Sequence, residues 1–269
     1  MLPSLFKVGP LEIRTYGLML AIAFLLGITI SANRAKKRGE NPDNIYFFAY
    51  FLVFFSILGA RLFYVVFHLD EFAGRWIYTV LPFQEDGTIG IAGLMILGGV
   101  VFGFITAVIF FRIKKLDFFT YGDIIAPALP LGIFFGRLGC FFNGCCFGDV
   151  CHHAWGVVFP PESPAGAVMG NLPLHPTQLY ESFFNLLLFF IILFIEMKWK
   201  PISNIKGSLL SIFLIGYGVE RIIVDLFRHY ESQMFVLPGI EINQIISFFM
   251  IVLGIYIIIK NKKSVKTTQ

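Results

Sequence analysis

Three arginines stand in segments of the chain that are otherwise strongly apolar: Arg61 in LGARLFYVVF, Arg137 in FFGRLGC and Arg221 in GYGVERIIVDLFR. A guanidinium in a bilayer costs about 2.5–3.5 kcal/mol on insertion scales unless it finds a partner, water or the interface. Its planar set of donors suits the oxygens of a phosphate group. We therefore predict that these three arginines together bind an anionic phosphate group.

Other interpretations apply to each arginine taken singly. Asp225 stands four residues after Arg221, so the two side chains can neutralise each other on a helix. An arginine near the end of a span can also extend its charge to the lipid head groups. Glycines in LGG, which ends at Gly99, and in NGCCFG, which ends at Gly148, allow close approach either of helix to helix or of protein to ligand.

The four cysteines of the chain fall within twelve residues, at Cys140, Cys145, Cys146 and Cys151. Disulfides would staple this segment in an oxidising compartment, with the two adjacent cysteines bonded to different partners. The thiols, with His152 and His153, could instead ligate zinc or copper, although C-x4-C-C-x4-C is not the usual paired spacing. A thiol of lowered pKa beside Arg137 could also act as a nucleophile. These three interpretations stay open.

The elements that position these residues are predicted to be membrane helices. Hydrophobic residues make up 57% of the 269 residues and charged residues 14%, and the mean hydropathy is +0.78, whereas soluble domains carry about 25% charged residues. Backbone polar groups find no partner in lipid, so segments of about 20 apolar residues must be helical. We predict an all-α polytopic bundle of seven transmembrane helices, at 17–33, 45–67, 91–111, 121–142, 179–198, 207–227 and 241–260.

Basic residues predict the orientation of these helices, because they resist translocation. Fourteen follow the odd-numbered spans, at Arg34, Lys36, Lys37, Arg38, Arg112, Lys114, Lys115, Lys198, Lys200, Lys206, Lys260, Lys262, Lys263 and Lys266. Four lie on the other side, at Lys7, Arg14, Arg75 and Arg228. The N-terminus is therefore predicted outside and the C-terminus in the cytoplasm, and the net charge of +4 needs no nucleic-acid partner.

Residues 143–178 form the longest stretch without a helical pattern, and they are rich in Gly, Pro and His. They are predicted to face outward between the fourth and fifth spans, either as a linker or as a segment on the membrane surface. We expect no cleavable signal before the first span, since residues 1–16 lack an apolar core and a small-residue cleavage site. We predict one integral membrane domain over residues 1–269.

Seven longer runs occur along the chain: RTYGLMLAIAFLLG, GARLFYVVF, GLMILGGVVFG, DIIAPALPLGIFFGRLGCFFNG, LHPTQLYES, GSLLSIFLIGYGVERIIVDLFR and INQIISFFMIVLG. In these runs, and in their order, the chain resembles bacterial prolipoprotein diacylglyceryl transferases. The resemblance implies a multi-pass enzyme of the bacterial inner membrane that moves the diacylglyceryl group of phosphatidylglycerol to the lipobox cysteine of a prolipoprotein signal peptide, as the first step of lipoprotein maturation. Its partners are these two substrates and the membrane lipid, and no cofactor or metal is implied.

Site residues follow from the same resemblance. Arg137, Asn143 and Gly148 match positions of the family signature G-R-x-G-N-F-x-N-x-E-x-x-G, and Arg221 matches the arginine of a GYG-x-x-R run. Tyr16 matches the tyrosine of a YGLM motif, and His175 the histidine of H-P-S/T-Q-L-Y-E. The expected catalytic set is Arg137, Arg221, Tyr16, Asn143 and His175, and the expected phosphatidylglycerol-binding set is Arg137, Arg221, Arg61, Gly98, Gly99 and Gly148. Arg228 is a further helper for the phosphate.

The run that contains Gln178, Tyr180 and Glu181 favours a structural role, because Thr177 can cap the helix that follows. The chain also departs from the family pattern. Leu97 stands where a histidine is usual, Cys140 replaces an asparagine, Cys145 replaces a glutamate, and Asp225 stands where glutamate is usual.

These departures remove a potential proton acceptor, and His68, His152, His153 and His175 are candidates to replace it. They also leave an alternative function open. A non-catalytic relative would keep the phospholipid site and use its cysteines and histidines for metal binding or thiol redox chemistry.

Overall fold

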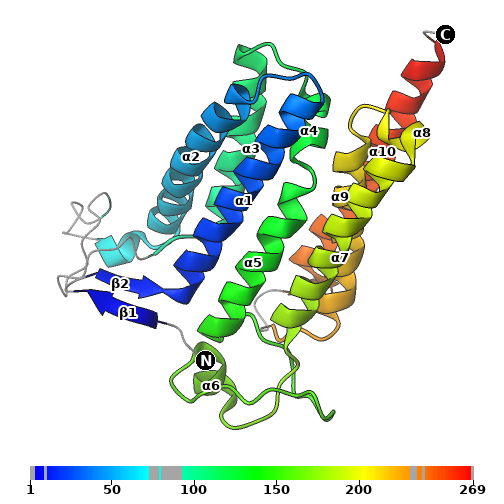
Figure 1. Ribbon diagram of the computed structural model, residues 1–269. Coiled ribbons are helices and arrows are strands. Elements are labelled where there is room, and N and C mark those ends of the chain that lie inside the picture. The colour runs from blue at the N-terminus through cyan, green and yellow to red at the C-terminus, as the bar shows by residue number, and fades with distance from the viewer. Residues whose placement is uncertain are drawn as a thin grey trace. The chain divides into compact units, whose positions relative to one another are not determined.

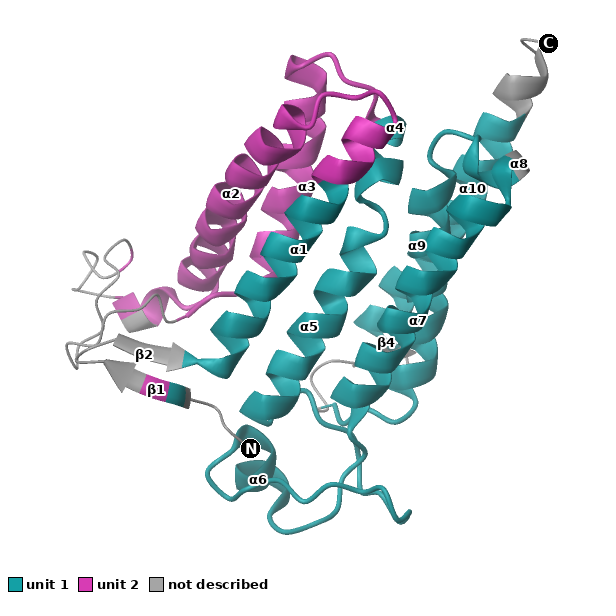
Figure 2. Cartoon of the chain, viewed as in Figure 1, with its two compact units in different colours: residues 1–5, 14–31, 119–269 teal, residues 6–13, 32–118 magenta. Residues whose placement is uncertain are grey.

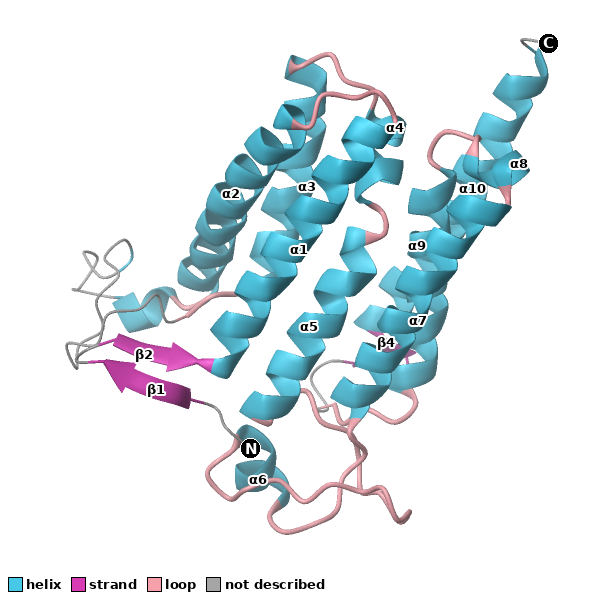
Figure 3. Cartoon of the chain, in the orientation of Figure 1, coloured by secondary structure: helices cyan, strands magenta, loops and turns pink. Residues whose placement is uncertain are grey.

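The computed structural model is a helical protein with two short two-stranded ribbons (Figures 1 and 3). It describes residues 4–8, 11–72, 79, 93–230, 235–237 and 240–267. Arg75, and the first two residues of the span expected at 91–111, lie outside the described residues. The elements are β1 (Ser4–Val8), β2 (Leu11–Arg14), α1 (Thr15–Lys37), α2 (Asp43–Phe67), the 3-10 turn η1 (Leu69–Phe72), α3 (Ile96–Ile113), α4 (Phe118–Ile125), α5 (Ala128–Asn143), α6 (Pro164–Met169), α7 (Thr177–Lys198), α8 (Lys200–Ser203), α9 (Ser208–Asp225), β3 (Phe235–Leu237), β4 (Ile240–Glu241) and α10 (Ile242–Thr267).

A helix lies at each segment predicted to cross the membrane. Among the described residues, five helices are long and apolar enough to span, namely α1, α2, α3, α7 and α10, and six do so if the bent pair α4 and α5 counts as one span. These helices confirm a multi-pass helical membrane protein. Helix α9 carries Glu220, Arg221 and Asp225, so a seventh crossing stays a prediction, as does the orientation of the termini.

The span predicted at 121–142 is interrupted rather than continuous. Its two helices meet at an angle of 44°, and Pro127 stands directly before the first residue of α5. Proline has no backbone N–H and disfavours helical geometry in the residue before it. The break therefore has a local cause in the sequence.

The chain divides into two compact units (Figure 2), and the first comprises residues 1–5, 14–31 and 119–269. Within it α5 packs on α7, α7 on α9, and α9 on α10. A cluster of buried apolar side chains lies among these helices and consists of Ala126, Leu188, Ile192, Leu209 and Phe213. This unit carries the polar site described below. The prediction of one domain stays a prediction.

The second unit comprises residues 6–13 and 32–118, and its main contact is between α2 and α3. The two helices approach closely because glycines face each other: a Cβ atom built on Gly98 would overlap the carbonyl oxygen of Gly59 and the side chain of Phe63. At Gly99 a Cβ atom would lie 3.3 Å from the carbonyl oxygen of Ser56. Helix packing thus accounts for both glycines of the LGG run.

Helix α9 is capped by a residue from α4. Gly207, which precedes α9, has no side chain, and the carboxylate of Asp123 takes its place. The Oδ2 atom accepts from the Gly207 N–H at 2.7 Å, and Oδ1 accepts from Leu209 at 2.8 Å and Leu210 at 3.0 Å. An anion there satisfies the unpaired N–H groups and suits the helix dipole. This contact fixes one end of the helix that bears Arg221.

Residues 144–176 have a core of their own rather than the form of a bare linker. Gly144 ends α5 in the left-handed conformation with φ of 71°, and α6 follows later in the segment. Phe159, Ala165 and Leu174 are buried together. Leu174 also forms isolated bridges with Val150 and Val157. The segment is therefore a folded platform at the end of α5.

Candidate arginine–carboxylate site

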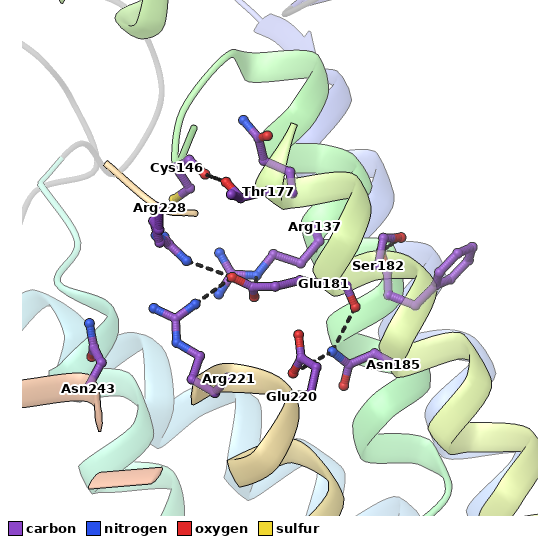
Figure 4. Close-up of polar contacts among 12 residues, drawn as sticks. Arg137, Cys146, Thr177, Glu181, Ser182, Asn185, Glu220, Arg221, Arg228 and Asn243 are labelled. Atoms are coloured by element: carbon purple, nitrogen blue, oxygen red, sulfur yellow. Dashed lines mark hydrogen bonds and ion pairs between the residues drawn. The ribbon is translucent and has the colours of Figure 1, made fainter. Parts of the chain in front are cut away.

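Three arginines converge on one carboxylate, Glu181, near the N-terminal end of α7 (Figure 4). Arg137 of α5 pairs through Nε with Oε2 of Glu181, and Arg221 of α9 pairs through Nη1 with Oε1. Arg228, which follows α9, places Nη1 2.6 Å from Oε1. The Glu181 side chain is 1% exposed, whereas those of the arginines are 18%, 9% and 10% exposed in the same order. The structure therefore brings two of the three predicted arginines together, and it adds the helper Arg228.

Arg221 has further partners that hold it in place. Its Nη2 atom lies 3.1 Å from Oδ1 of Asp225, as the spacing of four residues predicts, and donates to the Tyr230 hydroxyl at 2.7 Å. That hydroxyl donates to Asp225 at 2.7 Å and accepts from Asn243 at 3.1 Å. The network fixes the guanidinium of Arg221 from the side of α10. Self-neutralisation with Asp225 is thus only part of its environment.

Two polar residues lie next to Glu181 in the helix packing. Asn185 donates through Nδ2 to the backbone oxygen of Glu181 at 2.9 Å and to Oε2 of Glu220 at 3.3 Å. Sequence reasoning did not single out Glu220 or Asn185, and it gave Glu181 a structural role. Their positions within apolar helices could have identified them, because polar residues in such helices are costly and usually face the bundle interior.

Gly148 positions Arg228. Its N–H donates to the backbone oxygen of His175 at 2.9 Å, and it forms an isolated bridge with Arg228. A Cβ atom here would overlap the carbonyl oxygen of Phe227 and lie 2.9 Å from that of His175. Only glycine allows this close approach of backbones. The lipid contact predicted for Gly148 stays a prediction.

The run HPTQ tethers the cysteine turn to α7. The Thr177 hydroxyl donates to the carbonyl oxygen of Cys146 at 2.9 Å, and the Gln178 amide donates to that of Cys145 at 2.8 Å. The prediction that Thr177 caps α7 is wrong, because the N-cap position is Pro176 and no side-chain cap bond is made there. The hydroxyl is used instead to hold a loop that is distant in sequence.

His175 belongs to an aromatic pocket beside this run. Its Nδ1 atom lies 3.1 Å from the Tyr180 hydroxyl, which also accepts from the indole N–H of Trp155 at 2.9 Å. His153 and Phe227 complete the lining. Burial, followed by the nearby His153, lowers the pKa of His175 below 6.5. The surroundings of the ring therefore favour its neutral form over its charged form.

Tyr16 and Asn143 both lie near the C-terminal end of α5. Tyr16 packs on Gly139: a Cβ atom built on this glycine would lie 2.9 Å from Cδ2 of the tyrosine ring. Tyr16 also lies close enough to Arg137 for an electrostatic interaction. Asn143 is the last residue of α5, and its side chain contacts Cys145. Both therefore lie in the same unit as the arginines, and their catalytic roles stay predictions.

Arg61 has a different environment in the second unit. Its Nε atom donates to the carbonyl oxygen of Thr79 at 3.0 Å and Nη1 donates to that of Gly93 at 3.2 Å. The guanidinium also lies over the ring of Phe72, 5.2 Å from its centroid. Because Arg61, Gly98 and Gly99 belong to that unit, their part in lipid binding stays a prediction. The same unit holds His68, whose ring stacks on Tyr64.

Three of the four cysteines gather at the end of α5. The Sγ atoms of Cys140, Cys145 and Cys146 all lie within 4.8 Å of one another, and all four cysteines are free thiols. Cys151 is buried elsewhere, with Sγ 4.0 Å from the carbonyl oxygen of His153. Hydrogen bonds from the other two thiols lower the pKa of Cys146, and Arg228 and Arg137 act in the same direction.

Comparison with known proteins identifies relatives along almost the whole chain. A family model described as prolipoprotein diacylglyceryl transferase matches residues 3–260. A protein of Acaryochloris marina named phosphatidylglycerol--prolipoprotein diacylglyceryl transferase is 34% identical over 252 residues, which cover 94% of this chain and 88% of its own. Proteins of the same name from Idiomarina loihiensis (34% over 274 residues, 98% and 95%) and Pseudoalteromonas translucida (36% over 264 residues, 96% and 91%) are similar to the same extent.

Proposed function

Because the chain belongs to the prolipoprotein diacylglyceryl transferase family, we propose that it transfers the diacylglyceryl group of phosphatidylglycerol to a prolipoprotein cysteine. The observation that carries this proposal is the convergence of Arg137, Arg221 and Arg228 on Glu181. Three guanidiniums around one buried anion form a site that suits a phosphate group. The non-catalytic alternative is not favoured, since the relatives are named as transferases.

The proposed reaction is a displacement at carbon. The thiolate sulfur of the prolipoprotein attacks the glycerol carbon that bears the phosphate, a C–S bond forms, and the C–O bond to the phosphate breaks. The electron pair of that bond leaves on the oxygen of glycerol phosphate. Negative charge grows on the leaving group, so donors held around the phosphate stabilise the transition state more than the substrate.

Glu181 keeps the arginines ready for this task. Like charges would drive three guanidiniums apart, and one carboxylate that contacts all three holds them within reach of a common point. A lipid phosphate would share or take over these contacts. Arg137 has the most exposed side chain of the three, at 18%, and we assign it the first contact with the phosphate.

The other residues of the expected catalytic set belong to the same unit as the three arginines. We assign acceptance of the thiol proton to His175, because burial favours its neutral ring and its backbone is bonded to Gly148, the residue that positions Arg228. Tyr16 and Asn143 are assigned to the wall of the lipid pocket, next to Arg137. A lipid contact of Arg61, Gly98 and Gly99 is proposed on the family resemblance alone.

The proposed setting is the inner membrane of a bacterium, with the N-terminus outside and the C-terminus in the cytoplasm. It is supported by the fourteen basic residues on one side against four on the other. The donor lipid then enters from the bilayer. The lipobox segment of the signal peptide approaches the platform formed by residues 144–176, and bundle helices cross the membrane seven times.

The test is complementation joined to product analysis. Cells depleted of their own transferase receive this gene, and a reporter lipoprotein with a lipobox cysteine is isolated and weighed by mass spectrometry. We expect the reporter to gain one diacylglyceryl group, and a reporter with serine at that position to gain none. A chain that reaches wild-type abundance in the membrane and leaves the reporter unmodified would contradict the proposal.

A further inference from the structure

The cysteine cluster at the end of α5 points to a function that the transfer reaction does not use. We propose that Cys140, Cys145 and Cys146 bind one thiophilic metal ion, and that the monovalent copper ion is the best match. The ion would brace the turn that joins α5 to the folded segment 144–176. This inference does not rest on the transferase reaction.

The distances among the three thiols fit a shared ion. Metal–thiolate bonds are about 2.3 Å long, so three sulfurs around one ion lie about 4 Å apart. The three Sγ atoms already lie within 4.8 Å of one another. Small rotations of the side chains would therefore complete the site, without any movement of the helices.

The turn that gathers the thiols is held from several sides. The Cys145 N–H donates to the carbonyl oxygen of Cys140 at 3.1 Å, and Thr177 and Gln178 bond the carbonyl groups of Cys146 and Cys145. Cys146 has a φ of 64°, a left-handed conformation that is unfavourable for residues other than glycine. The structure thus maintains a strained backbone that turns Cys146 toward the other two thiols.

The donor set selects the kind of ion. Thiolates are soft ligands that favour Cu(I) and zinc over magnesium or calcium. Structural zinc sites usually take four protein ligands, whereas the described cluster supplies three. Three thiolates are sufficient for Cu(I). Three thiolates and Cu(I) carry a net charge of −2, and the guanidiniums of Arg228 and Arg137 lie close enough to Cys146 to interact with it.

The burial of the three thiols and their place in the chain are consistent with an ion that binds reversibly and stabilises the turn. Cys140 is buried, while Cys145 and Cys146 are half-buried, so an ion can enter from the loop side. Cys140 follows Arg137 by three residues, which is less than one helical turn. An ion bound there therefore orders the same turn that presents the arginine.

Binding is tested on the full chain, purified in detergent, reduced and kept free of oxygen. Cu(I) is titrated in competition with bicinchoninate, whose coloured copper complex reports the free ion. We expect one Cu(I) per chain to resist the competitor, and X-ray absorption to show sulfur ligands at about 2.3 Å. The variants C140S, C145S and C146S should each bind Cu(I) with an affinity at least tenfold lower than that of the wild-type chain.

The matched control is C151S, which removes the buried cysteine outside the cluster and should keep the copper. Thermal unfolding supplies a second readout: Cu(I) should raise the Tm of the wild-type chain and of C151S, and leave that of C140S unchanged. Without copper, the melting transition of C140S shows that the variant is folded. Equal loss of copper from C151S, or failure of the reduced, folded wild-type chain to bind, would overturn the proposal. A disulfide between two of the three cysteines in protein alkylated before reduction would overturn it as well.

Discussion

Two buried carboxylates contact helix α9, and they differ in what surrounds them. Asp123 is 2% exposed and accepts hydrogen bonds from the backbone N–H groups at the start of the helix. Glu181 is fully buried and contacts the side chains of Arg137, Arg221 and Arg228. Both carboxylates are thus supplied with donors, the first by the backbone and the second by side chains from separate elements.

Because of this difference, we interpret Asp123 as a structural anion and Glu181 as an anion that another anion can replace. Backbone N–H groups of a helix are fixed in direction, so the bonds to Asp123 can only break if α9 moves. Guanidinium groups stand on flexible stems and can turn toward another anion. We therefore expect changes at Asp123 to act on folding and changes around Glu181 to act on binding and rate.

The largest effect is expected for Arg137→Lys. A lysine keeps the charge and loses the planar pair of donors, so we expect the rate of diacylglyceryl transfer to fall about 100-fold, the size found when a transition-state donor is removed. The assay is transfer from phosphatidylglycerol to a lipobox peptide by the purified enzyme. Arg112→Lys, at an exposed position at the end of α3, is the control and should stay within twofold. Near-normal transfer by Arg137→Lys would show that the phosphate is bound elsewhere.

The next effect is expected for Glu181→Gln, which leaves three arginines around a neutral side chain. Loss of one partner of a buried ion pair costs about 3–5 kcal/mol, and the partial exposure of Arg137 should reduce this cost. We expect a lower Tm and about tenfold slower transfer.

A phosphate should then replace the missing anion. Phosphatidylglycerol is expected to raise the Tm of Glu181→Gln by more than it raises that of the wild-type enzyme. Diacylglycerol with the same acyl chains, which lacks the phosphate, is the matched control ligand. Equal stabilisation by the two lipids would show that Glu181 does not occupy the place of a phosphate.

A smaller effect, confined to stability, is expected for Asp123→Asn. The amide keeps one acceptor and loses the negative charge at the helix N-terminus, so the free energy of unfolding should fall by about 1–2 kcal/mol. Transfer per folded molecule should remain unchanged. Urea or thermal unfolding in detergent measures the first quantity, and the peptide assay measures the second. A strong loss of transfer in a variant of normal stability would break the distinction between the two carboxylates.

The smallest effect concerns pH and His175. Its pKa is lowered in the folded state, so below pH 6.5 the unfolded chain binds more protons at this residue than the folded chain does. Stability should therefore fall slightly as the pH decreases through 6.5 toward the lowered pKa, and it should be unaffected above that range. We expect His175→Gln to remove this part of the pH dependence of Tm. An unchanged profile would show that the ring titrates as in the unfolded chain.

The membrane arginines could be identified from the sequence, because the free-energy cost of a charge in an apolar segment depends only on the neighbouring residues. Arg137 and Arg221 each stand in an apolar run, and such residues are rare unless they have a partner. Their common partner was not evident, because Glu181 lies in a run that reads as the start of a helix. Arg61 gave the same signal as the other two, and the structure supplies it with the backbone carbonyls of Thr79 and Gly93.

The sequence also did not determine which of the four cysteines lie together, although they are close in the chain. Twelve residues contain all four, and the sequence left disulfide, metal and redox interpretations open. The left-handed turn at Gly144 and Cys146 decided that three thiols meet and that Cys151 does not join them. No pattern of residue types predicts a positive φ at a cysteine, because glycine is the residue that usually adopts this conformation.

The sequence by itself determined that this chain is a helical membrane protein of several spans, since hydropathy and helix formation depend on neighbouring residues. It also determined which cations must find partners in an apolar setting. Only the tertiary structure decided that α5, α7 and the segment after α9 supply Arg137, Glu181 and Arg228 to one point. Those residues are separated by more than forty positions in the chain, and helix packing, which joins elements regardless of that separation, is what brings them together.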